Sequence, residues 1–154
     1  MMCNTILEIY DRGGVKSSEF LKAMIRLEKT MEPSLSLRGI NIKNYSQKLM
    51  DCAELLILRR KEDIVGISAF YANNLQDRTA YLSFIAIMPD IVGLGLGRKL
   101  LDESEKRAMA LGMGKMELEV LKNNLHAIDF YKKMGYTDYG KSSDHSKYMV
   151  KNLG

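Results

Sequence analysis

The spacing of apolar residues divides the chain into alternating predicted strands and helices. Period-two alternation or short apolar runs predict strands at 5–10, 55–58, 64–71, 81–88, 116–121, 136–139 and 147–150. Apolar residues three or four apart predict one helix opening at 17 and others over 43–52, 96–111 and 124–134. No linker, repeat or low-complexity segment interrupts this order, so residues 1–154 are expected to form a single mixed α/β domain.

The segment after the fourth predicted strand has the strongest chemical signal. The run 81–88 is almost continuously apolar, which predicts a central strand covered on both faces. It ends at Pro89, and Gly93, Gly95 and Gly97 then alternate before a helix. Such a loop presents bare backbone N–H groups at the positive end of the helix, where a pyrophosphate is held favourably. The loop therefore predicts a phosphate-bearing ligand.

Two common glycine-loop motifs do not fit the spacing. A dinucleotide fingerprint requires Gly-x-Gly-x-x-Gly, but Gly97 falls one residue early for the third glycine. A P-loop requires Gly-Lys-Ser/Thr, whereas Gly114-Lys115 is followed by Met116. A dinucleotide-binding protein remains a third hypothesis, which NAD affinity without coenzyme A affinity would support.

Composition narrows the function classes. The chain of 154 residues is 46% hydrophobic and 27% charged, as in ordinary globular domains. Its net charge of +4 is spread along the sequence, which suits a polyanionic ligand but predicts no nucleic-acid binding. No apolar stretch approaches a membrane span and no signal peptide is recognisable, so a cytoplasmic location without membrane attachment is expected. Cys3, Cys52, His126 and His145 are isolated, so no metal site is predicted.

Two blocks of sequence together resemble the GNAT superfamily of N-acetyltransferases. The family signature Gln/Arg-x-x-Gly-x-Gly/Ala corresponds to Val92-Gly93-Leu94-Gly95-Leu96-Gly97, with Val92 where the family usually has Gln or Arg. The segment 118–136 resembles the family's later pattern, with Asn124, Ala127, Tyr131 and Gly135 in register. The resemblance covers roughly residues 64–150 and implies an α/β (α+β) GNAT fold, with a mixed sheet of about six to seven strands flanked by about four helices.

The resemblance also implies a cofactor and the residues that bind it. Acetyl-CoA would lie where the strand 81–88 splays from the strand 116–121, with its pantetheine arm along the main chain near Ile85 and Ile87. Asn124 caps its helix or contacts the pantetheine, and both roles are compatible. The pyrophosphate would accept main-chain N–H groups from Val92, Gly93, Leu94, Gly95, Leu96, Gly97 and Arg98.

Two side chains are candidates for proton transfer. The phenol of Tyr131 matches the family position that protonates the departing thiolate, although it also continues an apolar stripe with Phe130. Glu119 interrupts an apolar strand, and its separation from Tyr131 (131 − 119 = 12) resembles the base–acid pair of ribosomal-protein alanine N-acetyltransferases. A partly desolvated Glu119 would accept the proton of the amine, directly or through water. Strand alternation equally allows Glu117 or Glu119 to face solvent.

The resemblance predicts an acetyl-CoA-dependent N-acetyltransferase in which a primary amine attacks directly within a ternary complex. The acceptor is a small molecule or a peptide N-terminus, and a second copy of the chain is a candidate partner. Choice of acceptor is expected to depend on the connection 31–38, where Glu28 and Glu32 could attract a cation or simply be solvated. The alternative is a non-catalytic acyl-CoA-binding or regulatory domain of the same fold.

Overall fold

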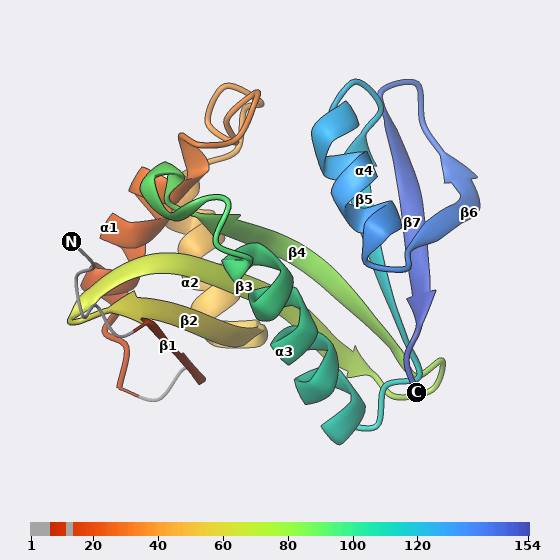
Figure 1. Cartoon of the computed structure of the whole chain (residues 1–154), viewed down its shortest axis with the longest axis horizontal. Helices are drawn as coiled ribbons and strands as arrows, with labels where there is room; N and C mark the ends of the chain where they lie inside the picture. The colour runs from red at the N-terminus through yellow and green to blue at the C-terminus, as the bar shows by residue number, and fades with distance from the viewer. Residues whose placement is uncertain (1–6, 12–13) are drawn as a thin grey trace. The chain divides into compact units, whose positions relative to one another are not determined.

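The computed structural model describes residues 7–11 and 14–154, and its elements follow the predicted order (Figure 1). The first two residues of the strand predicted at 5–10, and Cys3, lie outside the described residues. A short 3₁₀ helix, η1 (Pro89–Ile91), was not predicted. The strands are β1 (Leu7–Asp11), β2 (Glu54–Arg60), β3 (Asp63–Asn74), β4 (Thr79–Ile87), β5 (Lys115–Leu121), β6 (Thr137–Ser142) and β7 (Ser146–Asn152). The α-helices are α1 (Ser17–Glu28), α2 (Ile42–Cys52), α3 (Leu96–Ala110) and α4 (Leu125–Lys133).

The strands form one seven-stranded sheet in the order β1-β2-β3-β4-β5-β7-β6. β4 and β5 run parallel, whereas β1 with β2, β5 with β7 and β6 with β7 are antiparallel. The mixed sheet and its flanking helices confirm the predicted fold class. The described residues divide into two compact units, one comprising those up to 69 with 84–103 and the other comprising 70–83 with 104–154.

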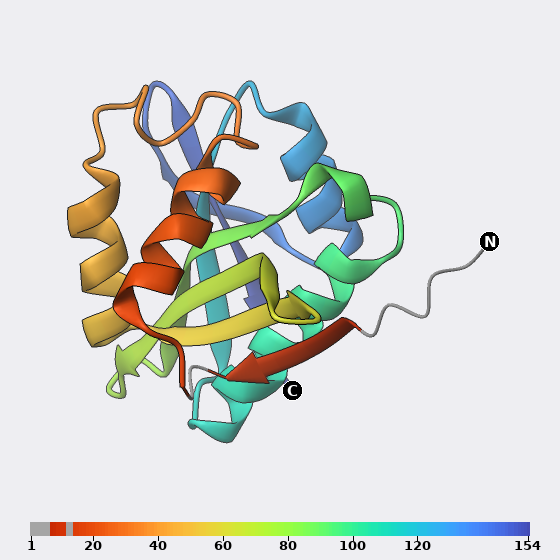
Figure 2. The same ribbon diagram turned by 90° about the vertical axis from the view of Figure 1, so that its left-hand side faces the viewer.

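The first unit has its core between α1 and the strands β2 and β3 (Figure 2). α1 buries Phe20, Ala23, Met24 and Leu27, whose three- and four-residue spacing places them on one face of the helix. β3 is a strand buried on both faces, because every residue from 64 to 70 is buried. Continuous burial is therefore found in β3 and, over 55–58, also in β2.

β4 is central in the strand order, as predicted, and its two faces are covered unequally. Its buried residues, Ala80, Leu82 and Phe84, alternate with the half-buried Tyr81 and Ser83. Successive side chains of a strand point to opposite faces, and here one face carries hydroxyl groups. The face with Tyr81 and Ser83 also carries Ile87, which packs on a buried apolar cluster, so this face is partly covered.

The second unit packs α4 and part of α3 with β5, β6 and β7. β5 alternates strictly, with Met116, Leu118 and Val120 buried and the residues between them half-buried or exposed. Met149 on β7 lies opposite Leu118 and is also buried, so both strands contribute to the same core. Among the described residues, no helix combines the length and apolar character that a membrane span requires.

Candidate functional site

The glycine loop lies in the first unit, between η1 and α3. Gly93 and Gly95 have φ angles of 94° and 76°, which L side chains rarely adopt. A Cβ added to either glycine would meet nothing within 4 Å, so both backbones line open space. Val92 and Leu94 beside them are 61% and 66% exposed. The loop therefore exposes the main chain of its glycines together with the side chains of Val92 and Leu94.

The N-terminus of α3 gives this loop its electrostatic character. The first intrahelical bond runs from the N–H of Lys99 to the carbonyl of Gly95, at 3.0 Å. The preceding N–H groups of the first turn have no helical acceptor, and the helix dipole adds a partial positive charge there. The N–H of Val92, in contrast, donates to the carbonyl of Pro89 at 3.3 Å. The geometry thus fits an anion held after Val92, from Gly93 to Arg98.

The end of β4 carries the main chain predicted to contact pantetheine. Residue pairing between β4 and β5 runs from Thr79 with Lys115 to Leu82 with Leu118, and β4 continues to Ile87. Both Ile85 and Ile87 lie in this continuation and are half-buried. The side chain of Ile87 packs on an apolar cluster formed by Leu58, Val65 and Ile91, which anchors the strand end next to the loop.

In the second unit, α4 is defined by a side-chain cap at its start. Asn124 has non-helical backbone angles, and its side-chain oxygen accepts the N–H of Ala127 at 3.2 Å. This is the bond expected of an N-cap, and it satisfies one of the unpaired donors of the first turn. The predicted capping role of Asn124 is confirmed, while its contact with pantetheine stays a prediction.

The C-terminus of α4 orients Tyr131. Gly135, with φ of 97°, donates its N–H to the carbonyl of Lys132 at 3.0 Å. Tyr136 donates its N–H to the carbonyl of Tyr131 at 2.9 Å. These two bonds form a Schellman motif, in which the third-last helical residue packs on the second residue after the cap. The rings of Tyr131 and Tyr136 make that contact, with centroids 5.7 Å apart and planes at 65°.

The environment of Tyr131 disfavours ionisation of its phenol. Its ring also meets Phe130 edge-on, at 5.4 Å between centroids. Burial raises the pKa of Tyr131 to about 12, because the charged phenolate loses hydration among these rings. A neutral phenol with a retained proton is what a general acid requires before it acts.

Glu119 occupies a different environment from the one predicted. It is exposed on β5, whereas Glu117 on the same face is half-buried. Its carboxylate accepts a short hydrogen bond from Ser146 Oγ, and Ser146 itself is only 4% exposed. The expected desolvation of Glu119 is therefore not found, since strand alternation directs it away from the core side of β5. Its role as a base stays a prediction.

A buried polar network behind Tyr136 was missed in the sequence. Glu105 on α3 accepts the hydroxyl of Tyr136 at 2.8 Å through one oxygen and Lys151 Nζ at 2.8 Å through the other. Glu105 is 5% exposed and Tyr136 is 2% exposed. Helical spacing could have indicated that Glu105 is buried, because it places this residue on the same face of α3 as the buried Leu101 and Ala108.

For Glu28, attraction of a cationic acceptor and simple solvation were both open, and the structure shows neither. It is 3% exposed, and its two carboxylate oxygens accept the backbone N–H and the hydroxyl of Ser36, at 3.2 and 3.0 Å. The carboxylate thus fixes the connection between α1 and α2 from within. The position of Glu28 next to the buried Leu27 did not predict this contact, because its partner Ser36 lies in an irregular segment.

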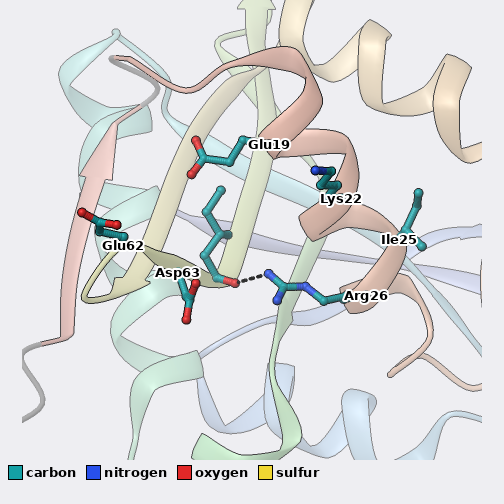
Figure 3. Close-up of a pocket in the computed structure, with 7 residues that line it drawn as sticks. Glu19, Lys22, Ile25, Arg26, Glu62 and Asp63 are labelled. Carbon is teal, nitrogen blue, oxygen red and sulfur yellow. Dashed lines mark hydrogen bonds between the residues drawn. The ribbon is translucent and has the colours of Figure 1, made fainter.

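A pocket of about 470 Å³ opens elsewhere in the first unit, beside α1 (Figure 3). It is lined by Glu19, Lys22, Ile25, Arg26, Glu62, Asp63 and Ile64, none of them a predicted site residue. Glu19 is paired with Arg59 at 2.9 Å, and Arg26 donates to the carbonyl of Ile64 at 3.0 Å. Charges of both signs at its rim make this pocket a poorer match to a polyanion than the glycine loop.

Comparison with known proteins identifies the class of fold. Over 97% of this chain and 95% of the other, the structure matches the ribosomal-protein-S18-alanine N-acetyltransferase from Escherichia coli, with a TM-score of 0.75 and 18% identity. A Bacillus anthracis protein assigned as a streptothricin acetyltransferase, solved in complex with acetyl coenzyme A, matches with a TM-score of 0.59 and 22% identity. That match covers 67% of this chain and 64% of the other. At these identities the likeness concerns the fold, which is that of acetyltransferases.

Sequence comparison then gives the family. The model of the acetyltransferase (GNAT) family matches residues 21–136, and the chain belongs to this family. It is also 31% identical over 77 residues to the thialysine N-epsilon-acetyltransferase of Bos taurus. The match covers 49% of this chain and spans only 45% of the cattle enzyme. Family membership implies acyltransferase activity, and the family's fold generally binds acetyl-CoA.

Proposed function

We propose that this chain is an N-acetyltransferase that moves the acetyl group of acetyl-CoA to a primary amine by direct attack in a ternary complex. The observation that carries the proposal is the phenol of Tyr131, which a Schellman motif orients at the end of α4 and which stands where the family has its proton donor. A regulatory domain that only bound an acyl-CoA would gain nothing from a proton donor at this family position.

The residues of the glycine loop fit the cofactor. Acetyl-CoA, when bound, supplies a thioester whose carbonyl carbon forms a bond to nitrogen while its bond to sulfur breaks. The N–H groups from Gly93 to Arg98, with the dipole of α3, would hold its pyrophosphate. The open space beside Gly93 and Gly95 leaves room for this close approach. The absent Gln or Arg at Val92 removes a side-chain contact, while the main-chain contacts remain.

Proton transfers by two side chains complete the proposed chemistry. The Tyr131 hydroxyl donates its proton to the departing sulfur, so that a neutral thiol leaves. An ammonium acceptor must lose two protons: Glu119 takes the first before attack, directly or through a water molecule, and the second, lost after attack, restores the phenol of Tyr131. The hydrogen bond from Ser146 Oγ holds the Glu119 carboxylate in one orientation on β5. An oxyanion would be stabilised by a main-chain N–H near Ile87.

A cationic amine is the acceptor class we propose. Glu117 and Glu119 share one face of β5, and the register places Tyr81 of β4 beside Glu117 and Tyr148 of β7 beside Glu119. Carboxylates and aromatic rings both attract an ammonium group. The names of two similar proteins, one a thialysine Nε-acetyltransferase and one an S18-alanine N-acetyltransferase, support a nitrogen acceptor of either a small molecule or a peptide.

Calorimetry with acetyl-CoA followed by a thiol-release assay over amines and peptides tests this function. Tyr131→Phe is expected to lower kcat by about a hundredfold or more with little change in acetyl-CoA affinity. Tyr139→Phe is the matched control and should keep wild-type turnover. Gly95→Val should weaken acetyl-CoA binding, whereas Gly140→Val, at a glycine without positive φ, should not.

Two results would overturn the proposal. Tight acetyl-CoA binding without turnover on any amine or peptide would favour the regulatory alternative. Affinity for NAD without affinity for coenzyme A would favour a dinucleotide-binding protein.

A further inference from the structure

The buried network on Glu105 is more elaborate than packing requires. Taking the Glu105 carboxylate out of water costs free energy that its partners only partly offset, and Lys151 keeps 27% of its side chain exposed. A phenylalanine at 136 and an apolar residue at 105 would fill the same space without that cost. Instead, both oxygens of Glu105 have a partner, one being Tyr136 and the other Lys151, each at 2.8 Å. Such a network favours one arrangement of its members over others.

The ring of Tyr136 connects the Glu105 network to Tyr131. Tyr136 is fixed at its backbone by the bond to the Tyr131 carbonyl and at its hydroxyl by Glu105. Lys151 Nζ also lies 5.9 Å from the centre of the Tyr136 ring. Because an edge-to-face pair has a preferred direction, a Tyr136 ring held at both ends restricts the orientation of the Tyr131 ring packed on it.

We propose that Glu105 and Tyr136 are positioning residues, which hold the phenol of Tyr131 in the direction that proton donation requires. The inference rests on the proposed function, in which Tyr131 is the general acid. It adds residues that act through ring packing and touch no reacting atom. All members of the network belong to the second unit, so the argument depends on that unit alone.

Kinetics of conservative variants give the first test. Tyr136→Phe and Glu105→Gln are expected to lower kcat on the order of tenfold, with the KM for acetyl-CoA within twofold of wild type, because misplacing a catalytic group slows the chemical step. The control is Tyr139→Phe, which makes the same change at a tyrosine of the second unit outside the network and should leave kcat unchanged. Assays are run well below each variant's melting temperature, so that folding does not limit activity.

A double-mutant cycle separates positioning from general damage. If Tyr136 acts through Tyr131, adding Tyr136→Phe to Tyr131→Phe should lower kcat no further. Effects that multiply, or an unchanged kcat in both Tyr136→Phe and Glu105→Gln, would overturn the inference. Loss of kcat in Tyr139→Phe to the same degree would also overturn it. A Tyr131→Phe variant with normal turnover would remove the general acid and the inference together.

A spectroscopic readout distinguishes failure of the inference from failure of the proposed function. In protein labelled with 3-fluorotyrosine, the fluorine resonance of Tyr131 is assigned by its loss in Tyr131→Phe. That resonance should shift or broaden in Tyr136→Phe and Glu105→Gln and stay in place in Tyr139→Phe. An unmoved resonance in both network variants refutes positioning, whether or not the protein acetylates any amine.

Discussion

Replacement of Gly135 by alanine tests the local structure that orients Tyr131. The φ angle of 97° places this residue in the left-handed region, where a Cβ is unfavourable by about 1–2 kcal/mol. The new Cβ would also lie 3.3 Å from Lys151 Cε, in a side chain whose Nζ is bonded to Glu105 at 2.8 Å. Because Lys151 cannot move freely without straining that bond, we expect a loss toward the upper end of the range.

Two other glycines separate these contributions. Gly112 ends α3 in the same type of motif with φ of 91°, but its Cβ would meet nothing within 4 Å. Gly112→Ala therefore measures the backbone cost alone. Gly140→Ala has neither a positive φ nor a neighbour and should change stability by no more than about 0.5 kcal/mol.

Scanning calorimetry and urea unfolding provide the measurement. For a chain of this size, a loss of about 2 kcal/mol lowers the melting temperature by about 4–8 °C. The expected order of destabilisation is Gly135→Ala, then Gly112→Ala, then Gly140→Ala. If Gly135→Ala were as stable as Gly140→Ala, the argument from φ would be refuted. If Gly135→Ala lost only as much stability as Gly112→Ala, the Lys151 side chain would move away from the new Cβ without a measurable loss of stability.

Three further perturbations follow from the same structure. Since the folded pKa of Tyr131 is about 12 and its ordinary value is 10.0, its contribution to stability is complete below pH 10 and is lost as pH rises through 12. Alkaline urea titrations should therefore show a smaller decline in Tyr131→Phe than in wild type. Glu28→Gln should cost about 1–3 kcal/mol in urea unfolding, because its bonds to Ser36 are buried, and should speed proteolytic cleavage within 29–41. Asn124→Ala should cost about 1 kcal/mol by removing the cap on Ala127, and Asn124→Asp should restore most of it.

The order of elements and the glycine loop could be read from the sequence because both depend on neighbours. A helix face repeats within four residues, and α1 begins at the predicted Ser17. The loop needs only glycines and the helix that follows, and Gly93 and Gly95 adopt the positive φ angles that it requires. The cap by Asn124 is equally local, since its partner is three residues away.

The remaining features depend on contacts that periodicity cannot encode. Tyr136 and Glu105 are separated by 31 residues, and Lys151 and Glu105 by 46. A charged residue on an apolar stripe signals that a partner exists but not where it lies. Glu28 illustrates the same point, because its position on α1 gives no indication that Ser36 would return to bind it. The exposure of Glu119 was one of two outcomes that strand alternation allowed.

The Schellman motif at the end of α4 depends both on local sequence and on contacts between residues far apart in the chain. Its hydrogen bonds and its ring contact are contained in residues 131–136, so the approximate place of the Tyr131 ring follows from local sequence. The residues that restrict the orientation of that ring, Glu105 and Lys151, come from α3 and β7. Under the proposed function, local sequence therefore selects the residue that donates the proton, whereas tertiary structure selects the direction in which it does so. Variants of Gly135 should consequently lower stability and turnover together, while Tyr136→Phe should lower turnover out of proportion to its effect on stability.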